Sequence, residues 1–172
     1  MIVRDATDED APACAAIYAP YVTKTAVSFE EEPPTPEQVA LRISSAQQRH
    51  AWLVLEIDGE VAGYAYGRHF AERPAYRWSC EVSIYLEQQR HRSGGGRLLY
   101  EALLTRLTDR GYRRAMAGMA LPNEASVGFH RALGFEPVGV YHRVGWKSGS
   151  WHDVAWMQRT ILDANDPPAE PH

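Results

Sequence analysis

The chain has 172 residues, of which 45% are hydrophobic and 23% charged, a composition typical of one soluble globular domain. Its formal net charge is -4 at pH 7, which argues against nucleic acid or an anionic membrane as a partner, because both are usually bound through dense positive charge. The two cysteines, Cys14 and Cys80, lie far apart without CxxC spacing. We therefore expect buried thiols rather than a disulfide or a metal site.

The first part of the chain is expected to hold two helices. Thr7 and Asp10 have the spacing of a capping box, which predicts a helix start. A second helix is expected to begin at Thr35 or Pro36. The segment between them, Val27 to Glu30, is expected to be a loop that shapes a pocket. Acidic residues follow Met1 before any long apolar run develops, so we expect no signal peptide, no membrane span and a cytoplasmic location.

The clearest local signal is a hairpin. Two β-prone runs, Trp52 to Ile57 and Val61 to Tyr66, flank Asp58-Gly59, the dipeptide that best tolerates the positive φ angles of a type I′ turn. Further strands are predicted over about 82–86, 114–119, 137–143 and 152–160, with helices over about 98–107 and 123–133. This order indicates an α/β fold built on a mixed sheet, with one domain over residues 1–162. Residues 163–172 are rich in Pro, Asp and Glu and are expected to form a disordered tail.

A basic, glycine-rich stretch lies between the strand that ends near Leu86 and the helix that follows. It comprises His91, Arg92, Ser93, Gly94, Gly95, Gly96 and Arg97. Amides at a helix start, close backbone approach at glycines and flanking guanidinium groups suit a pyrophosphate. Leu98 follows Arg97, which excludes a P-loop, and Leu99 stands where a dinucleotide fingerprint needs glycine. By itself the stretch is also compatible with a flexible turn.

The wider pattern adds a family resemblance. It is carried by Trp52-Leu53-Val54, Asp58 to Gly63, Arg73 with Ala75-Tyr76, Glu81, Ser83-Ile84-Tyr85, Leu121-Pro122-Asn123, Ser126-Val127, His130 with Ala132 to Phe135, and Gly149 to Val154. Across about residues 2 to 160 the chain resembles the Gcn5-related N-acetyltransferase (GNAT) superfamily, and within it the phosphinothricin / methionine sulfoximine acetyltransferases. The resemblance implies a mostly antiparallel central sheet flanked by helices, with splayed central strands.

The resemblance also implies acetyl-CoA as co-substrate and no metal. Its binding residues would be Ile84, Tyr85, Leu86, His91, Arg92, Ser93, Gly94, Gly95, Gly96, Arg97, Asn123, Ser126 and His130. The superfamily usually opens the loop with Gln or Arg where His91 stands, and the neighbouring arginines would supply the lost donor. Main-chain N–H groups near Tyr85 or Leu86 are expected to hold the oxyanion.

Two titratable residues are candidates for catalysis. Glu81 lies on the same side of its strand as Ser83 and Tyr85 by alternation, and it matches the family's proposed base. A salt-bridged strand-end glutamate is the alternative. His130 stands where many superfamily members carry a tyrosine that protonates the leaving thiolate, and a histidine can relay a proton near neutral pH. A buried structural histidine is the alternative there.

The substrate implied by the resemblance is a small amino-acid analogue such as phosphinothricin, methionine sulfoximine or methionine sulfone. Candidate pocket residues are Phe29, Glu30, Arg73, Tyr76, Arg77 and Lys147, with the cations meeting anionic groups. Relatives form homodimers with the acceptor site near the interface, and we expect the same here. Trp146, Trp151 and Trp156 suit a core or a subunit contact. The alternatives are an acetyltransferase that acts on a protein N-terminus or lysine, and a non-catalytic acyl-CoA-binding module.

Overall fold

The computed structural model describes residues 1–88, 94–163, 166 and 168–172. The elements, in chain order, are β1 (Ile2–Asp5), the 3-10 helix η1 (Asp8–Asp10), α1 (Ala11–Thr23), α2 (Pro36–Arg49), β2 (Trp52–Ile57), β3 (Glu60–His69), the 3-10 helix η2 (Pro74–Tyr76), β4 (Ser79–Leu86), α3 (Gly95–Asp109), β5 (Arg114–Ala120), α4 (Glu124–Ala132), β6 (Glu136–Lys147) and β7 (Ser150–Thr160). Every helix and strand expected from the sequence is present, with ends shifted by a few residues.

The predicted helix starts are confirmed by their hydrogen bonds. The Thr7 amide donates to Asp10 Oδ2 at 2.8 Å, and the chain enters α1 through the short helix η1. At α2 the capping box is reciprocal: the Gln38 amide donates to Thr35 Oγ1 at 3.3 Å, and the Thr35 amide donates to Gln38 Oε1 at 2.9 Å. Both boxes satisfy amides that the first turn of a helix leaves without partners.

The predicted hairpin has a type I′ turn between β2 and β3. Asp58 has φ 55° and Gly59 has φ 83°, so both central residues adopt the left-handed conformation that this turn requires. β3 continues past its predicted end at Tyr66 to His69. Gly67 weakens the strand signal in the sequence, but it lies against α3, where a Cβ at position 67 would be 2.9 Å from Leu107 Cδ2.

The sheet has seven strands in the order β1-β2-β3-β4-β5-β7-β6. All neighbours are antiparallel except β4 and β5, which are parallel. A parallel pair needs a crossover connection, and α3 supplies it. The sheet is therefore mixed and mostly antiparallel, as expected.

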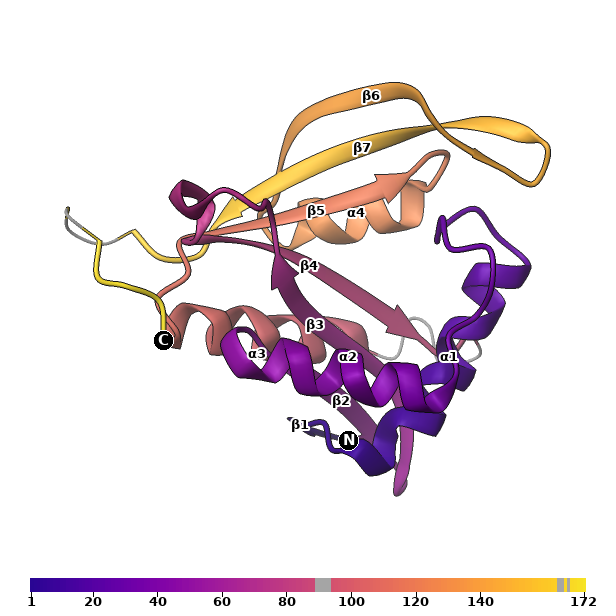
Figure 1. Cartoon of the computed structure of the whole chain (residues 1–172), viewed down its shortest axis with the longest axis horizontal. Helices are drawn as coiled ribbons and strands as arrows, with labels where there is room; N and C mark the ends of the chain where they lie inside the picture. Colours follow the sequence, from indigo (N-terminus) through magenta and orange to yellow (C-terminus); the bar gives the residue numbers. More distant parts are fainter. Residues whose placement is uncertain (89–93, 164–165, 167) are drawn as a thin grey trace.

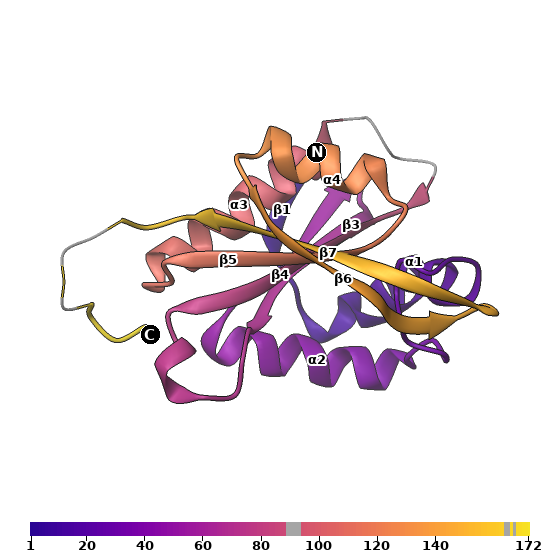
Figure 2. The same ribbon diagram turned by 90° about the horizontal axis from the view of Figure 1, so that it is seen from above.

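Helices cover both faces of the sheet. α3 and α4 lie on one side and α1 and α2 on the other (Figure 2). β2 shows how the sequence serves both layers: Leu53 and Leu55 are buried against α3, whereas Trp52 and Val54 are buried against α1 and α2. Because this strand is covered on both faces, its residues read as one continuous apolar run.

The two parallel strands, β4 and β5, diverge shortly after they begin. β4 pairs with β5 only over Ser79–Glu81 and Arg114–Met116, so beyond Glu81 and Met116 the strands diverge. Figure 1 shows the resulting wedge, with β5, β7 and β6 leaning away from β4. The splayed central strands are thus confirmed. They leave an opening in the middle of the sheet, between β4 and β5, next to the face of β4 that carries Ser83 and Tyr85.

The C-terminal residues that the structure describes make contacts near the start of β4. Trp78 Nε1 donates to the Ala169 carbonyl at 2.8 Å, Arg77 pairs with Glu170 at 2.7 Å, and the His172 amide donates to the Arg110 carbonyl at 2.9 Å. The disorder expected for residues 163–172 stays a prediction. Over the described parts of the chain, no helix has both the length and the apolar character needed to cross a membrane.

Candidate active site

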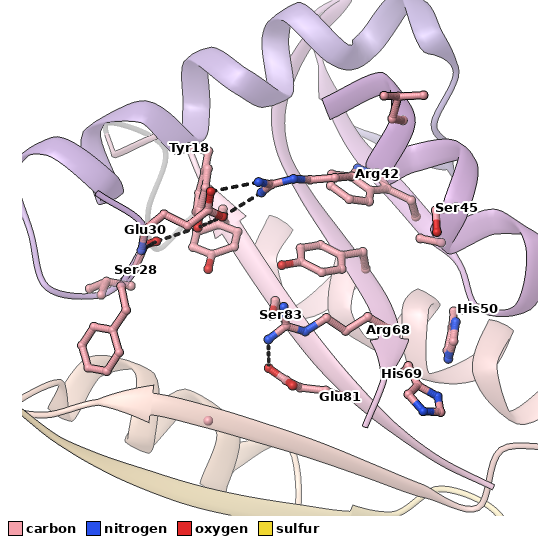
Figure 3. Close-up of a pocket in the computed structure, with 18 of the residues that line it drawn as sticks. Tyr18, Ser28, Glu30, Arg42, Ser45, His50, Arg68, His69, Glu81 and Ser83 are labelled. Atoms are coloured by element: carbon pink, nitrogen blue, oxygen red, sulfur yellow. Dashed lines mark hydrogen bonds and ion pairs between the residues drawn. The ribbon is translucent and has the colours of Figure 1, made fainter. Parts of the chain in front are cut away.

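A pocket of about 1060 Å³ lies on the α1/α2 side of the sheet, beside the opening between β4 and β5. Figure 3 shows how side chains from α1, α2, β3 and β4 converge on it. It is lined by Tyr18, Val27, Ser28, Phe29, Glu30, Leu41, Arg42, Ser45, Ala46, Gln48, Arg49, His50, Trp52, Tyr66, Arg68, His69, Glu72, Glu81, Ser83, Tyr85, Gly118, Ala120, Val154 and Trp156. The expected loop over residues 27–30 forms one wall.

Glu81 projects into this pocket from the point where β4 and β5 separate. Ser83 and Tyr85 line the pocket with it, whereas Ile84 and Leu86 pack in the α3 core, so the predicted alternation is confirmed. The carboxylate of Glu81 accepts a hydrogen bond from Arg68 Nη2 at 2.6 Å. Arg68 lies directly opposite Glu81 in the β3–β4 register.

A second ion pair crosses the pocket wall. Arg42 of α2 donates from Nη1 and Nη2 to the two carboxylate oxygens of Glu30 at 2.7 and 2.9 Å, and Tyr18 OH donates to Glu30 Oε1 at 3.0 Å. The hydrogen bonds from Arg42 hold the pKa of Glu30 below its usual range, against the opposing effect of burial. Glu30 therefore lines the pocket as predicted, but its carboxylate is already paired with Arg42.

Lys147 of β6 holds the loop that carries Phe29 and Glu30 through hydrogen bonds to main-chain carbonyls. Its Nζ donates to the main-chain carbonyls of Val22, Ser28 and Glu30 at 2.7, 2.5 and 2.8 Å. These three contacts use all three donors of an ammonium group. The structure thus places Lys147 beneath the loop, and Lys147 does not line the pocket. Its expected contact with an anionic group of the substrate stays a prediction.

The predicted residues Arg73, Tyr76 and Arg77 are not among the residues that line the pocket formed by this chain, and their expected contacts with the substrate stay predictions. Arg77 pairs with Glu170 and stacks over the Trp78 ring, with its Cζ 4.0 Å from the ring centroid. Tyr76 packs edge-on against Phe70, while Arg73 precedes η2. Contacts with the C-terminal residues attach the end of this loop: Arg77 donates to Glu170 and Trp78 donates to the Ala169 carbonyl.

Main-chain groups of β4 face the opening in the sheet. The Glu87 amide donates to the Ala62 carbonyl of β3 at 2.9 Å. By alternation the polar main-chain groups of Leu86 and Ile84 then point away from β3, and the Leu86 carbonyl indeed accepts from Tyr21 OH at 2.6 Å. The amides of these two residues are thus aimed at the space between β4 and β5, close to where the sequence predicted an oxyanion site.

The glycines at the start of α3 have separate structural reasons. Gly94 is the N-cap and has φ 81° in the left-handed region. Gly96 packs so closely on β4 that a Cβ would lie 2.9 Å from Leu86 Cδ1. The N-terminal amides of α3 therefore approach the end of β4, which suits a phosphate group there. Arg97 pairs with Glu101 at 2.9 Å, and the predicted contacts of His91, Arg92 and Ser93 fall outside the described residues.

His130 is buried, and both of its ring nitrogens have partners. Nδ1 donates to the Ser126 carbonyl at 2.8 Å, so Nε2 accepts from Tyr100 OH at 3.0 Å. Burial lowers the pKa of the imidazole. Asn123 caps α4 by accepting from the Ser126 amide at 3.1 Å. These contacts favour the structural interpretation of His130, and its proton-donor role stays a prediction.

Sequence reasoning did not find Arg68, Arg42 or Tyr18, although all three lie in the pocket. Arginines are common on protein surfaces, so nothing in their local sequence marks these two. The one available signal was the position of Arg68 near the end of a predicted strand next to the strand of Glu81. Within the described residues, no cluster of three or more His, Cys, Asp or Glu side chains is arranged to hold a metal ion.

Comparisons with known proteins agree with this geometry. The domain family described as "Acetyltransferase (GNAT) domain" matches residues 3–156. Phosphinothricin N-acetyltransferase of Streptomyces viridochromogenes is 37% identical over 98% of this chain and 93% of its own length. The L-methionine sulfoximine/L-methionine sulfone acetyltransferase of Pseudomonas paraeruginosa is 34% identical over 92% of this chain and 94% of its own.

A solved structure extends the likeness to three dimensions. A GNAT superfamily phosphinothricin acetyltransferase from Sinorhizobium meliloti, in complex with AcCoA, superposes with a TM-score of 0.89. It is 34% identical, and the match covers 97% of this chain and 94% of that one. The fold, the splayed strands and the sequence comparisons together show that this chain belongs to the GNAT acetyltransferase family.

Proposed function

We propose that this GNAT acetyltransferase moves the acetyl group of acetyl-CoA to the α-amino group of a small amino-acid analogue of the phosphinothricin, methionine sulfoximine or methionine sulfone type. The observation that carries the proposal is the position of Glu81. Its carboxylate stands at the point where β4 and β5 separate and also lines the pocket. An acyl group in the opening and an amine in the pocket would meet beside it.

The residues present fit acetyl-CoA as the co-substrate. The start of α3, with Gly94 in a left-handed conformation and Gly96 close to β4, offers main-chain amides to the diphosphate. The opening between β4 and β5 would take the pantetheine arm. The amides of Ile84 and Leu86, which face that opening, would hold the oxyanion.

The reaction makes definite demands on the pocket. A bond forms between the amine nitrogen and the acetyl carbon, while the bond from that carbon to the CoA sulfur breaks. An ammonium group must first lose one proton to become a nucleophile. After the attack the nitrogen loses a second proton, which balances the proton that the thiolate gains. Glu81 is the pocket carboxylate placed to accept the first proton, directly or through a water molecule.

Replacing Glu81 by Gln tests this role. We expect kcat to fall about 10²- to 10⁴-fold, the usual contribution of a positioned general base, while the affinity for acetyl-CoA stays unchanged. Thiol release would be measured with methionine sulfone, phosphinothricin and N-terminal peptides as acceptors. Glu72→Gln, which removes another carboxylate from the pocket lining, is the matched control. An unaltered kcat in Glu81→Gln would remove Glu81 from catalysis, and faster acetylation of the peptides would replace the proposed substrate class.

A homodimer in the cytoplasm is also part of the proposal. The exposed apolar side chains of the β6–β7 hairpin support a subunit contact, namely Val138, Val140, Tyr141, Val144, Trp146 and Trp151. Trp146 and Trp151 stack edge-on with their ring centroids 5.3 Å apart. Trp156 instead lines the pocket. Sedimentation of the purified protein at the mass of two chains is the expected result, and sedimentation as a single chain would contradict it.

A further inference from the structure

The pocket contains one arginine whose position matches the charge pattern of an α-amino acid. Three arginines line the pocket: Arg42, Arg49 and Arg68. Arg42 is committed to Glu30 through two hydrogen bonds, at 2.7 and 2.9 Å. The side chain of Arg68 donates from Nη2 to Glu81 and, within the described residues, makes no other hydrogen bond. A guanidinium group has five N–H donors, so Arg68 keeps the capacity to bind a second carboxylate.

The spacing of Arg68 and Glu81 sets what this pair can recognise. Arg68 Nη2 and Glu81 Oε1 are 2.6 Å apart. In an α-amino acid, ordinary bond lengths place the amino nitrogen about 2.5 Å from the carboxyl carbon. One substrate molecule can therefore bind Glu81 through its ammonium group and Arg68 through its carboxylate. Figure 3 shows the two side chains meeting within the pocket, Arg68 from β3 and Glu81 from β4.

The electrostatics of the pair also select against simple amines. An amine without a carboxylate brings only a positive charge to Glu81, and Arg68 would repel it at close range. A zwitterion adds one charge of each sign, so each side chain gains an opposite partner. The side chain of Arg68 is 57% exposed, so its guanidinium group is open to a ligand that enters the pocket.

We propose that Arg68 binds the α-carboxylate of the acceptor and thereby places its amino group against Glu81. This inference rests on the proposed function and deepens it, because it makes the enzyme selective for α-amino acids over amines of the same side chain. Arg68 is then a substrate-binding residue.

The test compares two acceptors that differ only in the carboxylate: L-methionine sulfone and 3-(methylsulfonyl)propylamine. Wild type should favour the amino acid in kcat/KM. In Arg68→Gln this preference should collapse on the order of 10²-fold, the loss expected for charge-assisted hydrogen bonds, through a raised KM for the amino acid. The simple amine should be acetylated as well as before or better. Arg68→Lys should restore part of the preference, because it keeps the charge but loses the two-pronged geometry.

Arg49→Gln is the matched control, since it removes another pocket arginine and should leave the preference unchanged. A preference that persists in Arg68→Gln, or that collapses in Arg49→Gln instead, overturns the inference. Calorimetric titration of L-methionine sulfone into the same variants, with CoA present, keeps the two claims apart. Binding that depends on Arg68 without acetylation contradicts the proposed function alone. Acetylation with a preference that does not depend on Arg68 contradicts this inference alone. If the protein neither binds nor acetylates L-methionine sulfone, both the inference and the proposed function are contradicted.

Discussion

Lys147 gives a sharp test of how the pocket wall is built. Its ammonium group donates to three carbonyls, those of Val22, Ser28 and Glu30, and so fastens the loop that carries Phe29. Lys147→Met keeps most of the aliphatic stem and removes all three donors. The loop then loses its attachment to β6, and the pocket wall opens.

The size of the effect follows from the contacts. A hydrogen bond to a charged group contributes about 1.5–3 kcal/mol. Lys147 is only half-buried, and water can reach the carbonyls once the loop opens. We therefore expect about 2 kcal/mol for the three bonds together, which corresponds to a roughly 30-fold fall in kcat/KM for the acceptor. The KM for acetyl-CoA should stay unchanged, because the start of α3 is not touched.

The assay is thiol release with a pair of acceptors, L-methionine sulfone and its decarboxylated amine. If Lys147 only holds the loop in place, Lys147→Met should lower kcat/KM for both acceptors by the same factor. Lys24→Met, the same substitution at an exposed lysine that caps the end of α1, is the control and should change neither. A loss confined to the amino acid would refute this reasoning, because it would mean that Lys147 binds the substrate anion directly.

Two further predictions concern stability. Burial lowers the pKa of His50 from 6.5 to about 4. Between these two pH values the imidazole is protonated in the unfolded chain but neutral in the folded chain. The stability that is present above pH 6.5 is therefore lost as the pH falls toward 4. The free energy of unfolding should fall by about 3 kcal/mol on account of His50. In urea unfolding, the free energy of unfolding of His50→Asn should depend less on pH than that of wild type or of the exposed control His172→Asn. Equal pH dependence in all three proteins would count against this prediction. Gly94→Ala should destabilise by about 1 kcal/mol because φ is 81° there, although nothing lies within 4 Å of the added methyl group. Gly128→Ala, equally open but inside α4, should instead stabilise by up to about 1 kcal/mol, and thermal melts that move both variants in the same direction would contradict this assignment.

Features that depend on neighbouring residues were predictable from the sequence. The turn at Asp58-Gly59 needs two positive φ angles, and the dipeptide supplies them locally. The pocket face of β4 followed from simple alternation, which placed Glu81 with Ser83 and Tyr85. The capping boxes at Thr7 and Thr35 are likewise local, because each joins residues three apart.

Features that depend on long-range register were not predictable in this way. Arg68 meets Glu81 because the loop over residues 70–78 sets the β3–β4 register, and no spacing rule fixes that loop. Lys147 was expected at the substrate because a cation suits its anionic groups. Its place beneath the loop was not predictable, because its contacts are with residues more than a hundred positions earlier in the chain. Arg73 and Tyr76 were expected at the substrate from a family pattern, and Arg77 as a nearby cation. The observed contacts of this loop instead include an ion pair of Arg77 with Glu170, which is 93 positions away in the chain.

Acetyl transfer is expected to take place where β4 and β5 separate. A crystal structure of the protein with CoA and methionine sulfone would show whether both ligands bind there. We expect the diphosphate at the start of α3, the pantetheine arm between β4 and β5, and the amino nitrogen within hydrogen-bonding distance of Glu81. CoA bound at another edge of the sheet, or the amine bound away from Glu81, would contradict this expectation.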